Sequence, residues 1–169
     1  MTAPLVFLDL ETTGLDPRTD QVWEFAAIRR EVDGAETRHH AFVRHPEHLR
    51  DSLPEPFRSD AARRYDPTAA LSRDTFADLL GTVLAGKPRL VGACPWFDAG
   101  FLAECVLRPT WSHRLIDVET LAAGKLGRLV NGLADAAQAF GIDHPSAHTA
   151  MGDAETAMKV YDAVMGADQ

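Results

Sequence analysis

The feature that most constrains this chain is a short apolar run, Leu5–Leu10, that contains one carboxylate, Asp9. A run that is apolar on both faces is typical of a central β-strand covered on both sides, so Asp9 would lie in the core. A buried carboxylate is tolerated only when it is paired or holds a metal ion. Side chains two residues apart on a strand point the same way, so Asp9 and Glu11 converge. Together they predict a site for a hard cation.

A simpler interpretation of the same residues stays open. Glu11 would lie beyond the strand in solvent, and Asp9 would cap a turn. The residues that follow, Thr12-Thr13-Gly14 and Asp16-Pro17, have the composition of a turn. Both carboxylates are therefore expected at the carboxyl end of the strand, where mixed α/β sheets tend to place their sites.

Length and composition predict one domain over residues 1–169. The chain is 46% hydrophobic and 25% charged, and its length allows a core without disulfides. No apolar run reaches the roughly 18 residues of a membrane span, so we expect a cytoplasmic protein with no membrane contact and with Cys94 and Cys105 as buried thiols. A net charge of -8 argues against a protein that coats nucleic acid non-specifically. It does not exclude an enzyme that carries its own cations to a phosphate.

Strand patterns come first along the chain, and helical patterns alternate with short strands afterwards. Strands at 21–30 and 36–43, joined by an Asp33-Gly34 turn, predict an antiparallel meander with the first strand. A long surface excursion follows at 45–68, with one short helix at about 60–65. Later helices are expected at 72–85, 95–107, through Leu121, 129–140 and 149–165, with short strands at 90–93 and 114–117. This order predicts an α/β protein.

Three further candidates lie near the starts of predicted helices. Asp98 sits among large apolar residues, which does not fit a solvated charge, although an acid that complements a helix N-terminus is an equal alternative. His148 and Asp153 are separated by about 140° of helical rotation, so they do not share one face. We expect His148 in the loop over the site and Asp153 in the first turns of the helix. The remaining histidines are expected to be surface or structural residues: His39, His40, His45, His48, His113 and His144.

Segments 7–14, 97–102 and 148–153 resemble, in order and spacing, the three motifs of the DEDDh 3'-5' exonucleases. That family of the ribonuclease H-like superfamily includes the proofreading subunit of bacterial DNA polymerase III, ribonuclease T and oligoribonuclease. The resemblance implies an α/β fold with a ribonuclease H-like mixed five-stranded sheet, its first three strands antiparallel, and helices on both faces. One departure is Ala93-Cys94-Pro95-Trp96, where members commonly have an Asn before the second-motif Asp. It bears on substrate contacts rather than on the catalytic set.

The resemblance also implies a set of site residues. Two divalent cations, Mg²⁺ or Mn²⁺, would be held by Asp9, Glu11, Asp98 and Asp153. Asp9 would bridge them, and His148 would deprotonate the attacking water. Ligands that are all oxygen suit these cations rather than Zn²⁺, and a base with a pKa near 6.5 accepts a proton at neutral pH. The terminal nucleotide would contact the backbone of Thr12 and the side chains of Leu15 and Phe101, two residues that fit equally well in a core.

The implied activity is hydrolysis of single-stranded DNA or RNA from the 3' end to nucleoside 5'-monophosphates. The expected partner is a single-stranded 3' end, with a DNA polymerase or a second copy of the chain as further possibilities. Two alternatives stay open: an exoribonuclease specific for short RNA, and a catalytically silent nucleic-acid-binding module of the same fold. The sequence does not distinguish ribose from deoxyribose, because a few contacts to the 2'-hydroxyl decide it.

Other polar and aromatic residues have simpler expected roles. Asp16 and Asp20 are expected in a turn, and Asp117 is expected to cap a helix. Glu24 is expected to face the strand that carries Asp9. Among the tryptophans, Trp96 is the strongest candidate for stacking on a base. Arginines in and beside the excursion could follow a phosphate backbone or form a solvated basic face: Arg44, Arg50, Arg58, Arg63 and Arg64.

Overall fold

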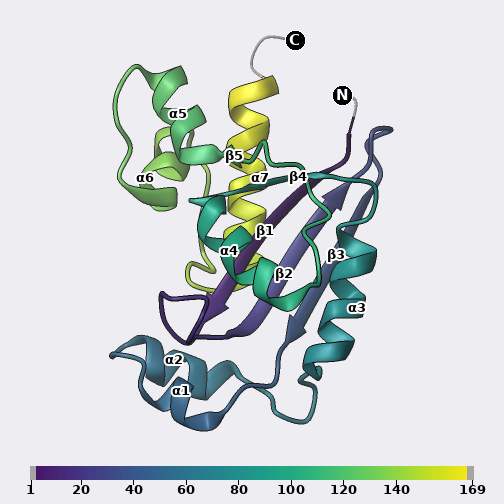
Figure 1. Ribbon diagram of the computed structural model, residues 1–169. Helices are drawn as coiled ribbons and strands as arrows, with labels where there is room; N and C mark the ends of the chain where they lie inside the picture. Colours follow the sequence, from purple (N-terminus) through teal and green to yellow (C-terminus); the bar gives the residue numbers. More distant parts are fainter. Residues whose placement is uncertain (1–2, 167–169) are drawn as a thin grey trace.

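A mixed five-stranded sheet forms the centre of the computed structural model, which describes residues 3–166 (Figure 1). Its strands follow the order β3-β2-β1-β4-β5. Strands β1 (Leu5–Thr12), β2 (Val22–Arg30) and β3 (Glu36–Phe42) form the antiparallel meander that the sequence predicts. Strands β4 (Arg89–Gly92) and β5 (Ile116–Asp117) continue the sheet in parallel. The predicted ribonuclease H-like arrangement is thus confirmed.

Strand β1 lies in the middle of the sheet and is covered on both faces. Val6 and Leu8 belong to a core cluster shared with helices α3 (Arg73–Val83) and α4 (Pro95–Cys105). Leu5 and Phe7 belong to a second cluster on the opposite face. Because side chains alternate along a strand, Asp9 points to the same face as Leu5 and Phe7.

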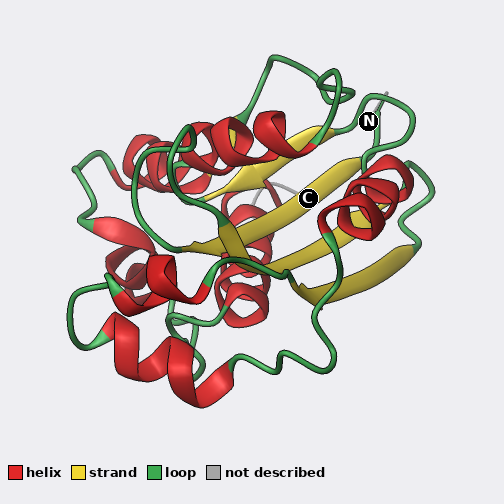
Figure 2. Ribbon diagram, turned by 60° about the horizontal axis from the view of Figure 1, so that its bottom comes forward, coloured by secondary structure: helices red, strands yellow, loops and turns green. Residues whose placement is uncertain are grey.

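Three helices cover that second face of the sheet: α5 (Val118–Leu126), α6 (Gly132–Ala139) and α7 (Ala150–Gly166). Figure 2 shows helices on both sides of the strands. The Phe7 ring meets the Tyr161 ring of α7 edge to face, at a centroid separation of 5.4 Å. This contact fixes α7 along β1, so the first turn of α7 comes to lie near the carboxyl end of that strand.

Side-chain caps define where two of the helices begin. The Ser72 hydroxyl accepts a hydrogen bond from the backbone N–H of Thr75 at the start of α3. The Asp117 carboxylate accepts from the N–H groups of Glu119 and Thr120 at the start of α5. These contacts satisfy N–H groups that have no partner inside the helix. The Asp117 cap was expected from the sequence.

The surface excursion holds two short helices rather than one. They are α1 (Glu47–Asp51) and α2 (Phe57–Arg64), and in Figure 1 they lie beyond the carboxyl end of β1. Leu53 and Ala61 pack with Trp23 of β2 in a small third cluster. With so few buried side chains, this region has no apolar period, which is why the sequence did not predict its helices correctly.

Three smaller expectations also differ from the structure. Helix α4 ends at Cys105, so Leu107 is exposed rather than packed. Helix α6 begins at Gly132 because Asp135 accepts a hydrogen bond from the Asn131 N–H and holds the preceding residues in a loop. Both cysteines are half-buried rather than buried. Within residues 3–166, no helix is both long and apolar enough to cross a membrane.

Substitution of two leucines tests which residues form the hydrophobic core. Leu80 on α3 is fully buried, whereas Leu129 is 89% exposed. We expect Leu80→Ala to lower the free energy of unfolding by about 2–5 kcal/mol, because it leaves a cavity. Leu129→Ala should change it by less than about 0.5 kcal/mol. Urea unfolding followed by circular dichroism measures both, and equal losses would contradict this assignment of the core.

Candidate metal centre

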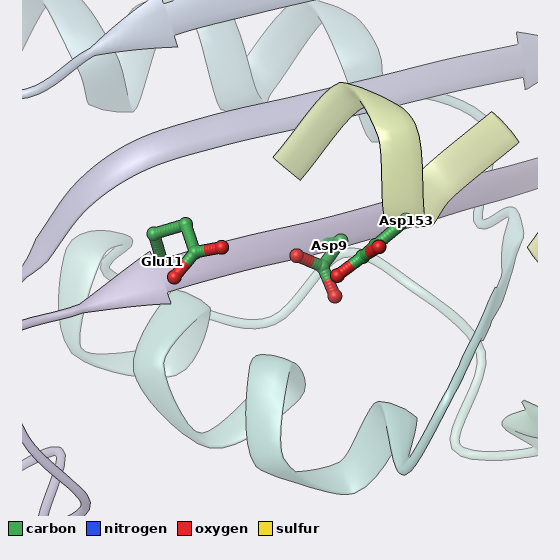
Figure 3. A group of neighbouring side chains, drawn as sticks. All are labelled: Asp9, Glu11 and Asp153. Atoms are coloured by element: carbon green, nitrogen blue, oxygen red, sulfur yellow. The ribbon is translucent and has the colours of Figure 1, made fainter. Parts of the chain in front are cut away.

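Three carboxylates meet where β1 passes under the first turns of α7. Asp9 and Glu11 come from β1 and Asp153 comes from α7 (Figure 3). One carboxylate oxygen from each lies within 4.8 Å of the others. All three side chains are partly buried. A cluster of partly dehydrated oxygen ligands is the donor set that Mg²⁺ and Mn²⁺ prefer, so the residues fit a divalent cation.

Gly152 allows the loop before α7 to approach this cluster. A β-carbon at Gly152 would lie 2.2 Å from the carbonyl oxygen of Ser146, a distance that real contacts do not permit. The Thr149 hydroxyl accepts a hydrogen bond from the Gly152 N–H, and the Asp153 N–H donates to the Thr149 carbonyl. The loop and the first turn of α7 therefore hold Asp153 as one unit.

Asp98 lies beside the three-residue cluster, in the first turn of α4. It is only 3% exposed, and its burial raises the pKa of its carboxyl group well above the ordinary value. Hydrogen bonds from its own N–H and from the Leu10 N–H act in the opposite direction. The Asp98 charge in turn raises the pKa of Asp9. Asp98 is thus close enough to act on the cluster but is not one of the three residues whose oxygens converge.

Burial and mutual repulsion shift the titration of the β1 carboxylates. The pKa of Asp9 lies well above its ordinary value, chiefly because of burial and then because of Asp98, Asp153 and Glu11. Burial raises the pKa of Glu11 to about 8, with Arg64 opposing the shift and Glu24 adding to it. Each shift has the same physical cause, since negative charge accumulates where little water can solvate it. A bound cation would relieve both effects.

The structure separates the two histidines near α7 in an unexpected way. His148 is exposed, has a positive φ of 62°, and turns its ring toward Phe57 of α2, with the ring centroids 6.3 Å apart. Instead, His144 contacts the Asp153 carboxylate through Nε2. The other ring nitrogen of His144, Nδ1, is buried without a hydrogen-bond partner within residues 3–166. The sequence offered no signal for this contact, because His144 lies in a loop with no period.

An ionic network around the buried Glu24 supports the cluster from the side of β2. Glu24 pairs in register with Glu11 and is almost fully buried. The sequence predicted that Glu24 faces β1, and this pairing agrees with it. Its carboxylate contacts Arg64 and accepts a hydrogen bond of 2.8 Å from His40 Nε2 in the tautomer that protonates that nitrogen. Arg64 Nη2 also lies 3.8 Å from Glu11 Oε1. A buried carboxylate needs such partners, and the network supplies them to Glu24 beside the candidate metal centre.

The candidate substrate contacts differ in accessibility. Thr12 donates its hydroxyl to the Gly14 carbonyl, and Leu15 is 84% exposed. Phe101 is buried, packs against Phe97 with ring centroids 5.0 Å apart, and lines a cavity of about 120 Å³. Leu15 is therefore free to contact a ligand, whereas Phe101 belongs to the core.

The segment before Asp98 and the turn after β1 each have a specific backbone geometry. Cys94 adopts a left-handed conformation with φ of 53°, which turns the chain from β4 into α4. Trp96 follows in the first turn and is 59% exposed, in contrast to the buried Trp23. Asp16 and Asp20 close the turn after β1 as expected, since the Asp16 N–H donates to the Asp20 carboxylate at 3.0 Å.

Fold and site together define a class of protein: a ribonuclease H-like α/β sheet with acidic residues on its central strand. The exonuclease family model named for ribonuclease T matches residues 6–161. The chain therefore belongs to this exonuclease family, within the DEDDh type that the motifs resemble. No curated protein matches the sequence.

Solved structures of exonuclease I have a similar fold. Escherichia coli exonuclease I in complex with a dT13 oligonucleotide has a TM-score of 0.69 and 20% identity, over 95% of this chain and 41% of that one. Exonuclease I from Methylocaldum szegediense has a TM-score of 0.72 and 20% identity, over 99% of this chain and 41% of that one. This chain thus spans about two fifths of their length, and the likeness concerns the fold.

The raised pKa values predict how stability depends on pH. Because the folded pKa of Glu11 is about 8, the folded protein keeps a proton that the unfolded chain releases near its ordinary pKa of 4.5. Stability is therefore lost as pH rises through about 8. We expect the melting temperature in chelator to fall between pH 6.5 and 8.5. Glu11→Gln should show a smaller fall, and an identical pH dependence in both proteins would contradict the burial of this carboxyl group.

Metal binding should reverse that loss. At pH 8 we expect Mn²⁺ or Mg²⁺ at about 100 times its dissociation constant to stabilise the fold by about 2.7 kcal/mol. For a chain of this size, the melting temperature would rise by about 5–10 °C. Differential scanning calorimetry measures the shift, and Asp9→Asn should abolish most of it. An unchanged melting temperature with both metals would count against the site.

Proposed function

We propose that this chain is a metal-dependent 3'-5' exonuclease that hydrolyses single-stranded nucleic acid to nucleoside 5'-monophosphates. The observation that carries the proposal is the convergence of Asp9, Glu11 and Asp153 oxygens within 4.8 Å, in a chain of an exonuclease family. Asp98, buried beside them, completes the proposed set for two cations, Mg²⁺ or Mn²⁺. Two such cations would stabilise the attacking and the leaving oxygen of an in-line displacement.

His148 is the proposed general base of this reaction. Its imidazole would accept a proton from the attacking water as the water oxygen bonds to phosphorus. The bond from phosphorus to the 3' oxygen of the preceding nucleotide then breaks, and that oxygen takes a proton from solvent. Because His148 is exposed, its ring can leave Phe57 by a rotamer change, a motion of picoseconds to nanoseconds for exposed side chains. Its position without substrate is therefore compatible with the role.

Single-stranded DNA is the substrate to test first. One structure with a similar fold, E. coli exonuclease I, is described with a bound dT13 oligonucleotide. The exposed Leu15 is our proposed contact for the terminal nucleotide, with the Thr12 backbone beside it. Binding to a DNA polymerase or to a second copy of the chain stays a prediction from the family resemblance. A cytoplasmic location stays a prediction from the composition and the two cysteines.

The decisive experiment follows 5'-labelled single-stranded DNA and RNA oligomers of equal length with Mn²⁺, Mg²⁺ or chelator. We expect a 3'-to-5' ladder that requires metal and is lost in Asp9→Asn. His148→Ala should slow the reaction about 10²–10⁴-fold, as loss of a general base does. His113→Ala is the matched control, because His113 is exposed and lies outside the site, and it should behave like the wild type.

Each alternative has its own outcome in the same experiment. Preferential hydrolysis of dinucleotide RNA would support the short-RNA exoribonuclease. Intact substrate under every metal condition, from a protein that is folded and binds the oligomer, would overturn the proposal and leave the silent binding module. Released mononucleotides that carry no 5'-phosphate would show that the bond between phosphorus and the 3' oxygen is not the one that breaks, contrary to the proposal.

A further inference from the structure

Arg64, the last residue of α2, is a partly buried cation at the edge of the candidate metal centre. Its side chain is 13% exposed, although the sequence suggested a surface arginine that could follow a phosphate backbone. The side chain of its neighbour Arg63, by contrast, is 75% exposed and pairs only with Asp60 among the ion pairs of residues 3–166. The guanidinium of Arg64 meets groups from α2, β1, β2 and the loop before α7: Asp60, Glu11, Glu24, Trp23 and the carbonyl oxygen of His148.

The contact to His148 is made to its backbone. Arg64 Nη2 donates a hydrogen bond of 2.8 Å to the His148 carbonyl oxygen. His148 has a φ of 62°, a conformation that few residues other than glycine adopt and that surrounding contacts must stabilise. Helix α2 supplies a second contact at its other end, where the Phe57 ring meets the His148 ring. Helix α2 thus holds the backbone of the proposed general base through Arg64, whereas the ring contact with Phe57 leaves the side chain able to rotate.

Arg64 is itself held firmly in place. Its Nη1 contacts the buried Glu24 carboxylate, and its Nε donates to Asp60 at 2.6 Å. The Arg64 guanidinium carbon lies 4.7 Å from the centroid of the Trp23 ring. Glu24 and Trp23 belong to β2, and Glu24 is the register partner of Glu11. A planar group with five donors can join these elements in one geometry. Arg64 therefore fixes the position of the His148 backbone relative to β2, and through β2 relative to β1, which carries Asp9 and Glu11.

We propose that Arg64 is a positioning residue that sets the distance between His148 and the carboxylates of the metal centre. Arg64 contacts the backbone of His148, the proposed general base, rather than a phosphate of the substrate. This inference rests on the proposed function, because the role of His148 comes from there. A misplacement of about 1 Å can cost on the order of 10² in rate, so loss of Arg64 should act on the chemical step.

The experiment compares Arg64→Gln and Arg64→Lys with Arg63→Gln. Arg63 is the matched control, since it also pairs with Asp60 but is largely exposed. We expect Arg64→Gln to lower kcat on the order of 10²-fold with KM for the oligomer within about twofold. Arg64→Lys should recover part of kcat, because it keeps the charge without the planar fork. Arg63→Gln should match the wild type.

A second measurement does not depend on activity. Hydrogen–deuterium exchange of the peptide that spans residues 145–150, in chelator, reports how firmly the His148 loop is held. We expect faster exchange in Arg64→Gln and unchanged exchange in Arg63→Gln. The double variant Arg64→Gln with Glu24→Gln controls for folding, because it also removes the buried carboxylate left without its partner. It should melt closer to the wild type than the single variant while its kcat stays low.

The outcomes separate this inference from the proposed function. If the wild type hydrolyses the oligomer and Arg64→Gln keeps its kcat and exchange rate, the positioning role is overturned and the exonuclease activity stands. A rise in KM at constant kcat would also overturn it, since Arg64 would then be a substrate contact. If the wild type is inactive with every metal, the proposed function fails. The exchange measurement then still decides whether Arg64 holds the His148 loop.

Discussion

The crowding of acidic side chains in a largely dehydrated place is the constraint on which the rest of the structure depends. Asp9 and Asp98 have pKa values well above their ordinary ones because burial and neighbouring charges disfavour ionisation. Such a cluster is tolerated if a cation or fixed positive charge offsets it. Within residues 3–166, Arg64 provides one such positive charge, but it pairs with Glu24 and lies beside the cluster. The space between the oxygens of Asp9, Glu11 and Asp153 therefore suits a divalent cation, which is the basis of the proposed chemistry.

The fold brings these groups together by simple means. Strand β1 is central, so its side chains reach helices on both faces, and α7 runs across the face to which Asp9 points. Strand β4 pairs with β1 at Leu5, Val6 and Phe7. Beyond Phe7, the N–H of Leu10 can donate to Asp98 instead of to a neighbouring strand. A small residue at 152 lets the loop before α7 lie close to the site. Each carboxylate is thus attached to a regular element, whereas the proposed base lies in a loop supported by α2.

Sequence patterns predicted the parts of this arrangement that depend on local rules. The apolar run around Asp9 indicated a central strand, and the two-residue spacing of Asp9 and Glu11 indicated that these acids converge. Both lie on the face that meets α7. The cap at Asp117 was predicted because a side chain bonds to the backbone two or three residues away. Helices α1 and α2 were not predicted correctly, since few of their side chains are buried and no period marks them. The contact of His144 with Asp153 was missed for the same reason.

By itself, the sequence determined the order of the strands and of the helices after residue 70, the central place of β1 and the identity of the acidic residues. These properties follow from periodicity and from the cost of burying charge, which act over a few neighbouring residues. Only the tertiary structure decided that the Arg64 side chain is 13% exposed while that of Arg63 is 75% exposed, and that the His148 ring contacts Phe57. Those features depend on the packing of α2 against β2 and the loop before α7. Segments about 40 and 84 residues away in the chain meet there at Arg64, and no local pattern encodes such distant contacts.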